Sequence, residues 1–226
     1  MRKFIISIFS SILFLAGTGT LYVANAQRLP QPKELLLQMR EALDGMGAAD
    51  FGFSFMAEDQ AGNVLGKETG NFLAEGERFR MTTSSLTVYC DGKTKWLYDM
   101  ANEEITVFPH DTASTDPAEN PFAVLRKADP SGYDFKGSVR NVEYEGRPAL
   151  EFRMASKDKN AAYTVVDFTV SAEDWLPVAI VYKNRNGDVY HLSVLSVSSV
   201  NGVTDALFVP PAELLDSPDV LVTDMR

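Results

Sequence analysis

Few side chains in this sequence have the chemistry that catalysis needs. The chain contains two histidines, His110 and His191, and one cysteine, Cys90. A nucleophile needs an adjacent base, and a zinc site needs several His or Cys ligands at short spacing. Neither histidine has such a companion in the sequence. These residue types therefore predict a protein that is not an enzyme and that holds no metal and no cofactor.

One catalytic alternative is left open. Cys90 would be a nucleophile if the fold brought His191 beside it, and such an enzyme would lose activity on substitution of either residue. His191 lies in a strand-like run, residues 189–197, where an imidazole on the polar face is the simpler interpretation. A free cysteine in a protein interior is usually a structural residue.

Aromatic side chains are the more telling feature. They crowd the first half of the chain, at Phe51, Phe53, Phe55, Phe72, Phe79, Tyr89, Trp96, Tyr98, Phe108 and Phe122. One helix packed on one sheet face needs fewer, so we expect some of them to line a cavity. The alternative is an ordinary hydrophobic core, which aromatic residues also dominate.

Apolar periodicity predicts one helix followed by strands. Residues 33–47 carry apolar side chains at helical spacing, namely Leu35, Leu36, Met39, Leu43 and Met46. From Phe51 onward the period changes to two, which is typical of strands. Turn signals recur at residues 61–63, 75–76, 91–92, 145–146, 186–187 and 201–202. This spacing indicates an antiparallel meander.

Two segments depart from the meander. Residues 110–120 are polar, and the proline-led residues 121–127 predict a short helix. Such a segment is either a lid over a binding site or a solvated connection whose helix plugs a sheet edge. The last residues, 210–226, contain three prolines and no sustained period, so we expect an extended tail that ends in a short edge strand.

The N-terminus predicts export. Arg2 and Lys3 precede an apolar run, residues 4–16, and residues 24–26 have the small-x-small pattern that signal peptidase prefers. We therefore expect a signal peptide over residues 1–26 and a periplasmic protein. The alternative is a retained membrane anchor, although the apolar run is shorter than the roughly 20 residues of a spanning helix.

Residues 27–226 have the size of a single domain. A lone cysteine cannot form an internal disulfide, so packing must hold this fold, and we expect the thiol to be buried. The formal net charge of the chain is -10, which opposes binding to nucleic acid or to an anionic membrane. An acidic surface instead suits a basic patch on a partner.

The segment 87–109 predicts a strand, a tight turn at Asp91-Gly92 and two further strands. Its pattern Asp-Gly-Lys-Thr-x-Trp-x-Tyr, residues 91–98, resembles the central hairpin of the periplasmic outer-membrane lipoprotein carrier family, the LolA-like proteins. Weaker similarities lie at Phe79, at residues 120–125, at residues 176–177 with 186–187, and at residues 208–211. The resemblance runs from the first helix nearly to the C-terminus.

The resemblance implies an α+β fold. In that family a curved antiparallel sheet forms an incomplete β-barrel, covered by helices that act as a lid over an apolar cavity for acyl chains. The lipid-binding residues that we expect on this basis are Phe53, Phe55, Phe72, Phe79, Trp96, Tyr98, Phe122 and Leu125.

The chain departs from the family at one position. Family members carry an arginine just before the turn that precedes the aromatic resembling Phe79, and it latches the lid by hydrogen bonds worth about 1.5–3 kcal/mol each. Residues 74–76 read Ala-Glu-Gly here. Strand alternation places Arg78 and Arg80 on the face opposite Phe79, so neither is a substitute. This loss predicts a looser lid or a different cargo.

We therefore expect a monomeric periplasmic carrier that shields the acyl chains of lipoproteins, or of a related lipid. It would take this cargo from an inner-membrane donor complex to an outer-membrane acceptor. Each methylene costs about 0.8 kcal/mol in water, so the cargo needs a cavity. The rival hypothesis is a lipid- or lipoprotein-sensing regulatory protein on the same half-barrel, with a membrane-anchored signalling partner.

Overall fold

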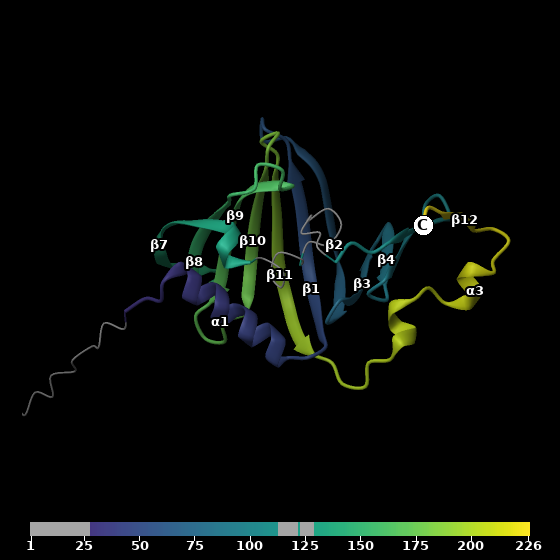
Figure 1. Ribbon diagram of the computed structural model, residues 1–226, viewed down its shortest axis with the longest axis horizontal. Coiled ribbons are helices and arrows are strands. Elements are labelled where there is room, and N and C mark those ends of the chain that lie inside the picture. Colours follow the sequence, from purple (N-terminus) through teal and green to yellow (C-terminus); the bar gives the residue numbers. More distant parts are fainter. Residues whose placement is uncertain (1–27, 113–121, 123–128) are drawn as a thin grey trace, which may run out of the picture.

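Twelve strands form one sheet in the computed structural model, which describes residues 28–112, 122 and 129–226 (Figure 1). The strands are β1 (Ala49–Glu58), β2 (Val64–Glu75), β3 (Arg78–Thr83), β4 (Leu86–Cys90), β5 (Thr94–Asp99), β6 (Glu104–Pro109), β7 (Tyr133–Tyr144), β8 (Arg147–Ser156), β9 (Tyr163–Ser171), β10 (Pro177–Asn184), β11 (Val189–Ser199) and β12 (Leu221–Asp224). The predicted strands of the segment 87–109 are confirmed as β4, β5 and β6.

The sheet is curved and open. Its strand order is β12-β6-β5-β4-β3-β2-β1-β11-β10-β9-β8-β7, so β12 and β7 are its edges and do not pair with each other. Neighbours are antiparallel, except that β12 runs parallel to β6. Two meanders, β1–β6 and β7–β11, meet where β1 pairs with β11. The predicted incomplete barrel is confirmed.

Helix α1 (Pro32–Gly45) lies across one side of the sheet (Figure 1). It begins with a proline at a position where no backbone N–H is needed, and Glu34 accepts a hydrogen bond from the backbone N–H of Gln31 at 3.3 Å. Its apolar stripe is buried in the main core: Leu35, Leu36, Met39 and Leu43. The predicted helix is confirmed. Among the described residues, no helix combines the length and apolar character needed to cross a bilayer.

The hairpin turns depend on local side-chain caps. Between β4 and β5, the carboxylate of Asp91 accepts hydrogen bonds from the backbone N–H groups of Lys93 at 2.8 Å and Thr94 at 2.7 Å. Gly92 takes a φ of +92°, which favours glycine. Asp99 caps the turn between β5 and β6 in the same way. These contacts are short in sequence, which is why the turns could be predicted.

The C-terminal segment wraps onto the outer face of the sheet. It contains a 3₁₀ helix, η2 (Asp205–Phe208), a one-turn helix, α3 (Ala212–Leu215), and the edge strand β12. Arg78 holds η2, because its guanidinium pairs with Asp205 and Glu75 and lies 4.8 Å from the ring centre of the buried Phe208. The predicted edge strand is confirmed, whereas η2 and α3 are too short to show a periodic pattern.

The main core lies on the concave face, where β2 must come close to β3. Gly70 of β2 faces Phe53 of β1 across the ladder. A Cβ on Gly70 would lie 2.1 Å from the carbonyl oxygen of Thr82 and 3.1 Å from the Phe53 ring. The strand therefore has no room for a side chain at this position.

We expect Gly70→Ala to lower the free energy of unfolding by about 1–3 kcal/mol, because the methyl group must displace backbone. Gly66→Ala is the matched control on the same strand, since nothing lies within 4 Å of its Cβ position. Urea denaturation of both variants measures the difference. Equal stability of the two variants would contradict the close approach at Gly70.

Candidate binding site

A cluster of phenylalanine rings lies at the centre of the concave face. The Phe122 ring stacks on Phe72 with ring centres 4.5 Å apart, and it lies 4.8 Å from Phe51 and 6.0 Å from Phe53. Phe72 also stacks on Phe79 at 5.4 Å. All five side chains are buried. We call them the aromatic cluster.

Strand register explains why these rings meet. Phe51 and Phe53 are two residues apart on β1, so both side chains point to the same face. Phe72 of β2 is the direct partner of Phe51. Phe79 of β3 pairs with Ala74, two residues beyond Phe72 and on the same face. The cluster therefore follows from the pairing of three neighbouring strands.

Four of the predicted lipid-binding residues are brought together in this way: Phe53, Phe72, Phe79 and Phe122. Phe55 is half-buried on the same face and stacks on Tyr190 at 5.9 Å. Leu125 lies outside the described residues.

Trp96 and Tyr98 do not join this group. They flank Leu97, which packs against the main core, so alternation turns both aromatic side chains to the outer face. There Trp96 lies between its ladder partners Tyr89 and Val107. The aromatic character of the hairpin drew attention to these two residues, but the face they occupy is set by register.

An apolar cavity of about 350 Å³ lies beside the aromatic cluster, under β4, β5 and β6. Its lining residues are Leu86, Val88, Lys95, Leu97, Phe108, Pro109 and Asp111. We call it the concave cavity. The sequence analysis did not single out these residues. The alternation of Leu97 with Trp96 and Tyr98 shows that Leu97 faces the opposite way from the two aromatic residues, but it does not show which face of the strand is the inner one.

The cluster and the concave cavity form one continuous apolar row. Phe72, Met81, Val88 and Leu97 are successive ladder partners on β2, β3, β4 and β5. Three interstrand spacings make this row about 14 Å long. Lys95 is its charged end, 8% exposed, with its ammonium 5.5 Å from the centre of the Phe108 ring.

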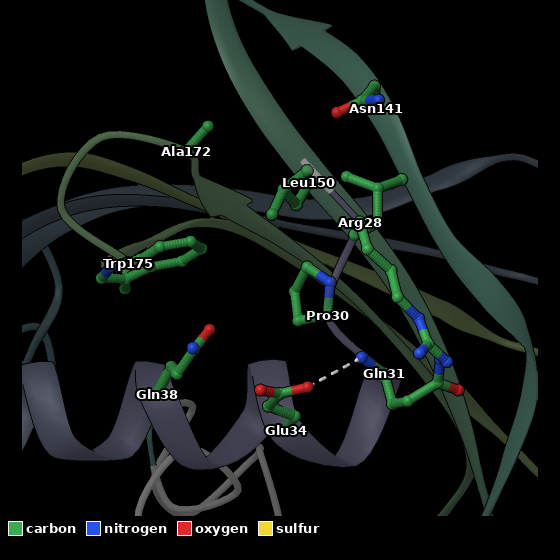
Figure 2. Close-up of a pocket in the computed structure, with 10 residues that line it drawn as sticks. Arg28, Pro30, Gln31, Glu34, Gln38, Asn141, Leu150, Ala172 and Trp175 are labelled. Carbon is green, nitrogen blue, oxygen red and sulfur yellow. Dashed lines mark hydrogen bonds between the residues drawn. The ribbon is translucent and has the colours of Figure 1, made fainter. Parts of the chain in front are cut away.

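A second and larger cavity, of about 810 Å³, lies between the start of α1 and strands β7 and β8 (Figure 2). We call it the helix cavity. Its lining residues are Arg28, Leu29, Pro30, Gln31, Glu34, Gln38, Asn141, Leu150, Ala172 and Trp175. In contrast to the concave cavity, half of these residues are polar.

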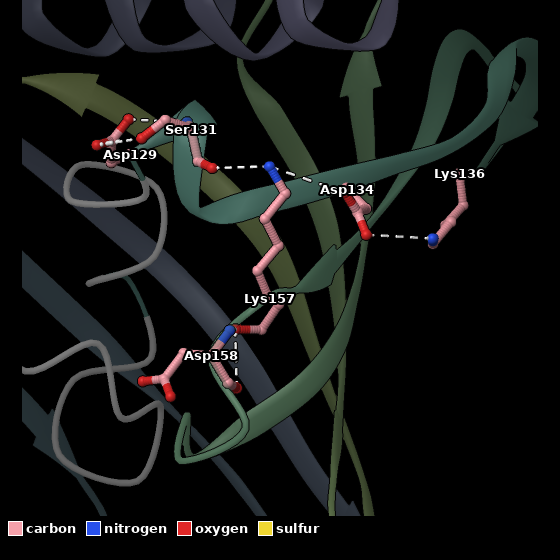
Figure 3. Close-up of polar contacts among 7 residues, drawn as sticks. Asp129, Ser131, Asp134, Lys136, Lys157 and Asp158 are labelled. Carbon is pink, nitrogen blue, oxygen red and sulfur yellow. Dashed lines mark hydrogen bonds and ion pairs between the residues drawn. The ribbon is translucent and has the colours of Figure 1, made fainter.

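The segment predicted to form a lid, residues 110–127, lies largely outside the described residues, and Phe122 is the exception within residues 113–128. Where the described chain resumes, polar contacts fix it to the sheet (Figure 3). Asp129 caps the 3₁₀ helix η1 (Pro130–Gly132) by accepting from the backbone N–H of Ser131 at 2.8 Å. The ammonium of Lys157 donates to the Ser131 carbonyl at 2.9 Å and lies 3.8 Å from Asp134.

The structure does not bring Cys90 and His191 together. Cys90 lies on β4 and His191 on β11, and strands β3, β2 and β1 separate them. Cys90 is fully buried, as predicted, and its thiol donates to the carbonyl of Glu77 at 3.7 Å. His191 lies on the outer face, 3.4 Å from Glu58. The described residues contain no group of three His, Cys, Asp or Glu side chains that could hold a metal ion.

His110 is largely buried, although it begins a polar segment of the sequence. Its side chain is only 6% exposed and meets the Phe79 ring edge-on, with ring centres 6.0 Å apart. The residue directly follows β6, which carries it to the buried side of the sheet.

Comparisons with known proteins bear on the fold. No protein-family model matches the sequence, and a search of curated proteins gives no match. The structure is similar to the crystal structure of an uncharacterized conserved protein from Thermus thermophilus, with a TM-score of 0.54 and 13% identity. That match covers 85% of this chain and 98% of the other. At this identity the likeness concerns the fold alone.

Two further matches have lower TM-scores. A LolA superfamily protein from Nitrosomonas europaea matches with a TM-score of 0.44 and 10% identity, over 80% of this chain and 98% of that one. MucB, in the Pseudomonas aeruginosa MucA/MucB complex, matches with a TM-score of 0.45 and 18% identity, over 79% of this chain and 60% of that one.

We expect the thiol of Cys90 to be inert in the folded protein, because it is fully buried in the main core. Its reaction with an aromatic disulfide reagent should proceed only through unfolding, and it should accelerate steeply in denaturant. A rapid reaction under native conditions would contradict the burial of this residue and would reopen the question of a reactive thiol.

The turn that joins β5 and β6 should weaken in acid. Hydrogen bonds from the side chain and backbone of Asn102, and then from the backbone of Ala101, lower the pKa of Asp99 from its ordinary value of 3.8. Its contribution to stability is therefore full above pH 3.8 and lost as the pH falls through the lower folded-state pKa. Wild type should exceed Asp99→Ala in stability at neutral pH, and this difference should shrink below pH 3.8.

Thermal denaturation from neutral to strongly acidic pH measures the two curves. Asn102→Ala is the control, because it removes the amide that contributes most to the lowered pKa of Asp99. A stability difference that stays constant down to the lowest pH would show that Asp99 acts only as a neutral acceptor.

Proposed function

We propose that this protein is a periplasmic carrier that shields the acyl chains of lipoproteins, or of a related lipid, on the concave face of its sheet. The observation that carries the proposal is the apolar row from Phe72 to Leu97, which joins the aromatic cluster to the concave cavity. An apolar surface of this kind, continuous with an open cavity, is suited to a flexible hydrocarbon chain.

The energetics of transfer favour such a site. Each methylene removed from water contributes about 0.8 kcal/mol, so an acyl chain gains affinity in proportion to the length it buries. A flexible chain needs few directional contacts, and the charged residues that line the concave cavity are Lys95 and Asp111. Release to an acceptor is easier from such a lining than from a site with many specific hydrogen bonds.

The lining can also adapt to its contents. Met81 is part of the row, and methionine fills irregular space because its side chain has several rotatable bonds. Phe122 occupies the middle of the aromatic cluster, where it stacks on Phe72. In this proposal an acyl chain that extends from the concave cavity toward Phe53 takes the place of the Phe122 ring.

Export and delivery complete the proposal. A signal peptide over residues 1–26 would bring the protein to the periplasm, where the cargo passes from an inner-membrane donor complex to an outer-membrane acceptor. The family's lid arginine is absent, and Arg78 holds the C-terminal segment on the outer face instead. The carrier would therefore bind its cargo without that latch.

The test uses two substitutions on adjacent residues of β5. Leu97→Asp places a carboxylate in the concave cavity and should weaken binding of the fluorescent fatty acid cis-parinaric acid by more than about tenfold, because the charge must be desolvated. Tyr98→Asp adds the same charge on the outer face and should leave the affinity unchanged. Circular dichroism confirms that both variants are folded.

The cargo class is identified by native mass spectrometry and lipid extraction of protein purified from the periplasm of its host. Co-purified lipid or lipoprotein that is lost in Leu97→Asp supports the carrier. A wild-type protein that takes up no fatty acid, or equal losses in Leu97→Asp and Tyr98→Asp, would overturn the proposal.

A further inference from the structure

The helix cavity is larger than the concave cavity, and the carrier proposal does not use it. It is open to solvent at Arg28, Gln31 and Glu34, which are exposed, and it ends at Leu150, which is buried. Its volume of about 810 Å³ falls within the range of small-molecule sites. An acyl chain is not suited to it, since polar side chains line half of it.

The polar side chains of the lining are all of one chemical kind. All five polar side chains end in a planar group: the guanidinium of Arg28, the carboxylate of Glu34, and the amides of Gln31, Gln38 and Asn141. Together they offer donors and acceptors in pairs at fixed geometry. Such pairs match adjacent hydroxyl groups, each of which donates and accepts a hydrogen bond.

Gln38 supplies an unused acceptor. Its side-chain oxygen Oε1 is buried and has no hydrogen-bond partner. A buried polar atom without a partner costs about 1–3 kcal/mol, so its retention needs an explanation. Figure 2 shows this side chain reaching from α1 toward Trp175, across the space of the cavity. A ligand that donates a hydrogen bond there would satisfy it.

Trp175 supplies a flat apolar wall. Its backbone adopts a φ of +64°, which L-residues rarely take and which costs free energy. A tight turn maintains this conformation, with the Trp175 N–H donating to the Ser171 carbonyl at 3.2 Å and the Leu176 carbonyl accepting from the Ser171 N–H at 2.9 Å. The turn places the indole at the edge of the cavity, opposite Pro30 (Figure 2).

We propose that the helix cavity binds a short saccharide. A sugar ring has an apolar C–H face, which would stack on the indole of Trp175, and a rim of hydroxyl groups, which would bond to Gln38, Asn141 and Glu34. The combination of one aromatic wall with planar donors and acceptors fits this ligand class better than a lipid. It also differs from the concave cavity, whose lining is apolar apart from Lys95 and Asp111.

The chain provides its own reporter for a test. It has two tryptophans, Trp96 and Trp175, so Trp96→Phe leaves the indole at the cavity as the only one. Titration of this variant with maltotriose, cellotriose and tri-N-acetylchitotriose, up to millimolar concentrations, should give a saturable change in Trp175 emission with at least one sugar. Isothermal calorimetry on the wild-type protein checks the affinity.

Gln38→Leu tests the role of the buried acceptor. It should weaken saccharide binding by about tenfold or more, the loss of one hydrogen bond to a buried group. At the same time it should raise the thermal midpoint of the free protein, because an unsatisfied polar atom is replaced by an apolar one. Gln60→Leu, on the exposed turn between β1 and β2, is the matched control and should change neither quantity.

A substitution in one proposed site should not affect binding at the other. Leu97→Asp, in the concave cavity, should leave saccharide binding intact, whereas Gln38→Leu should leave fatty acid binding intact. No change in Trp175 emission with any of the three sugars, or equal sugar affinity in wild type and Gln38→Leu, would overturn the saccharide proposal. Saturation of the Trp175 signal by fatty acid alone would likewise overturn it.

Discussion

The pairing of β1 with β11 is the constraint on which the rest of the structure depends. It joins residues as far apart in sequence as Gly52 and Ser196, and it turns two separate meanders into one sheet with one concave face. At this seam the ladder contains a bulge next to Gly52, whose N–H donates to the Ser196 hydroxyl at 3.2 Å. A side chain on Gly52 would meet that hydroxyl at 2.5 Å. Bulges bend strands, and here the bend lies at the middle of the curved sheet.

Because the sheet is curved, the main core and the proposed binding site both lie on its concave face. Over the β1 and β9–β11 part of the sheet, the concave side is filled by α1 and by large inward side chains such as Phe168 and Tyr182. Over β4 to β6 the filling is incomplete, and the concave cavity results. The aromatic cluster lies between these regions. The proposed site is therefore a continuation of the apolar core.

The two cavities differ in the chemistry of their linings. The concave cavity is apolar and receives its lining from strands whose turns are capped by Asp91 and Asp99. The helix cavity is polar and receives its lining from the first turns of α1, from β7 and β8, and from the strained turn at Trp175.

The local elements follow from the amino-acid sequence alone. The helix at residues 32–45, the strands of the segment 87–109 and the turn at Asp91-Gly92 depend on periodicity and on contacts between near neighbours, so they could be predicted. The face that each side chain occupies depends instead on how the strands pair. In a strand a shift of one residue exchanges the two faces, and register is fixed by distant partners. For that reason the sequence alone did not show that Phe72 and Phe79 face the core while Trp96 and Tyr98 face outward, and the two cavities became visible only in the folded chain.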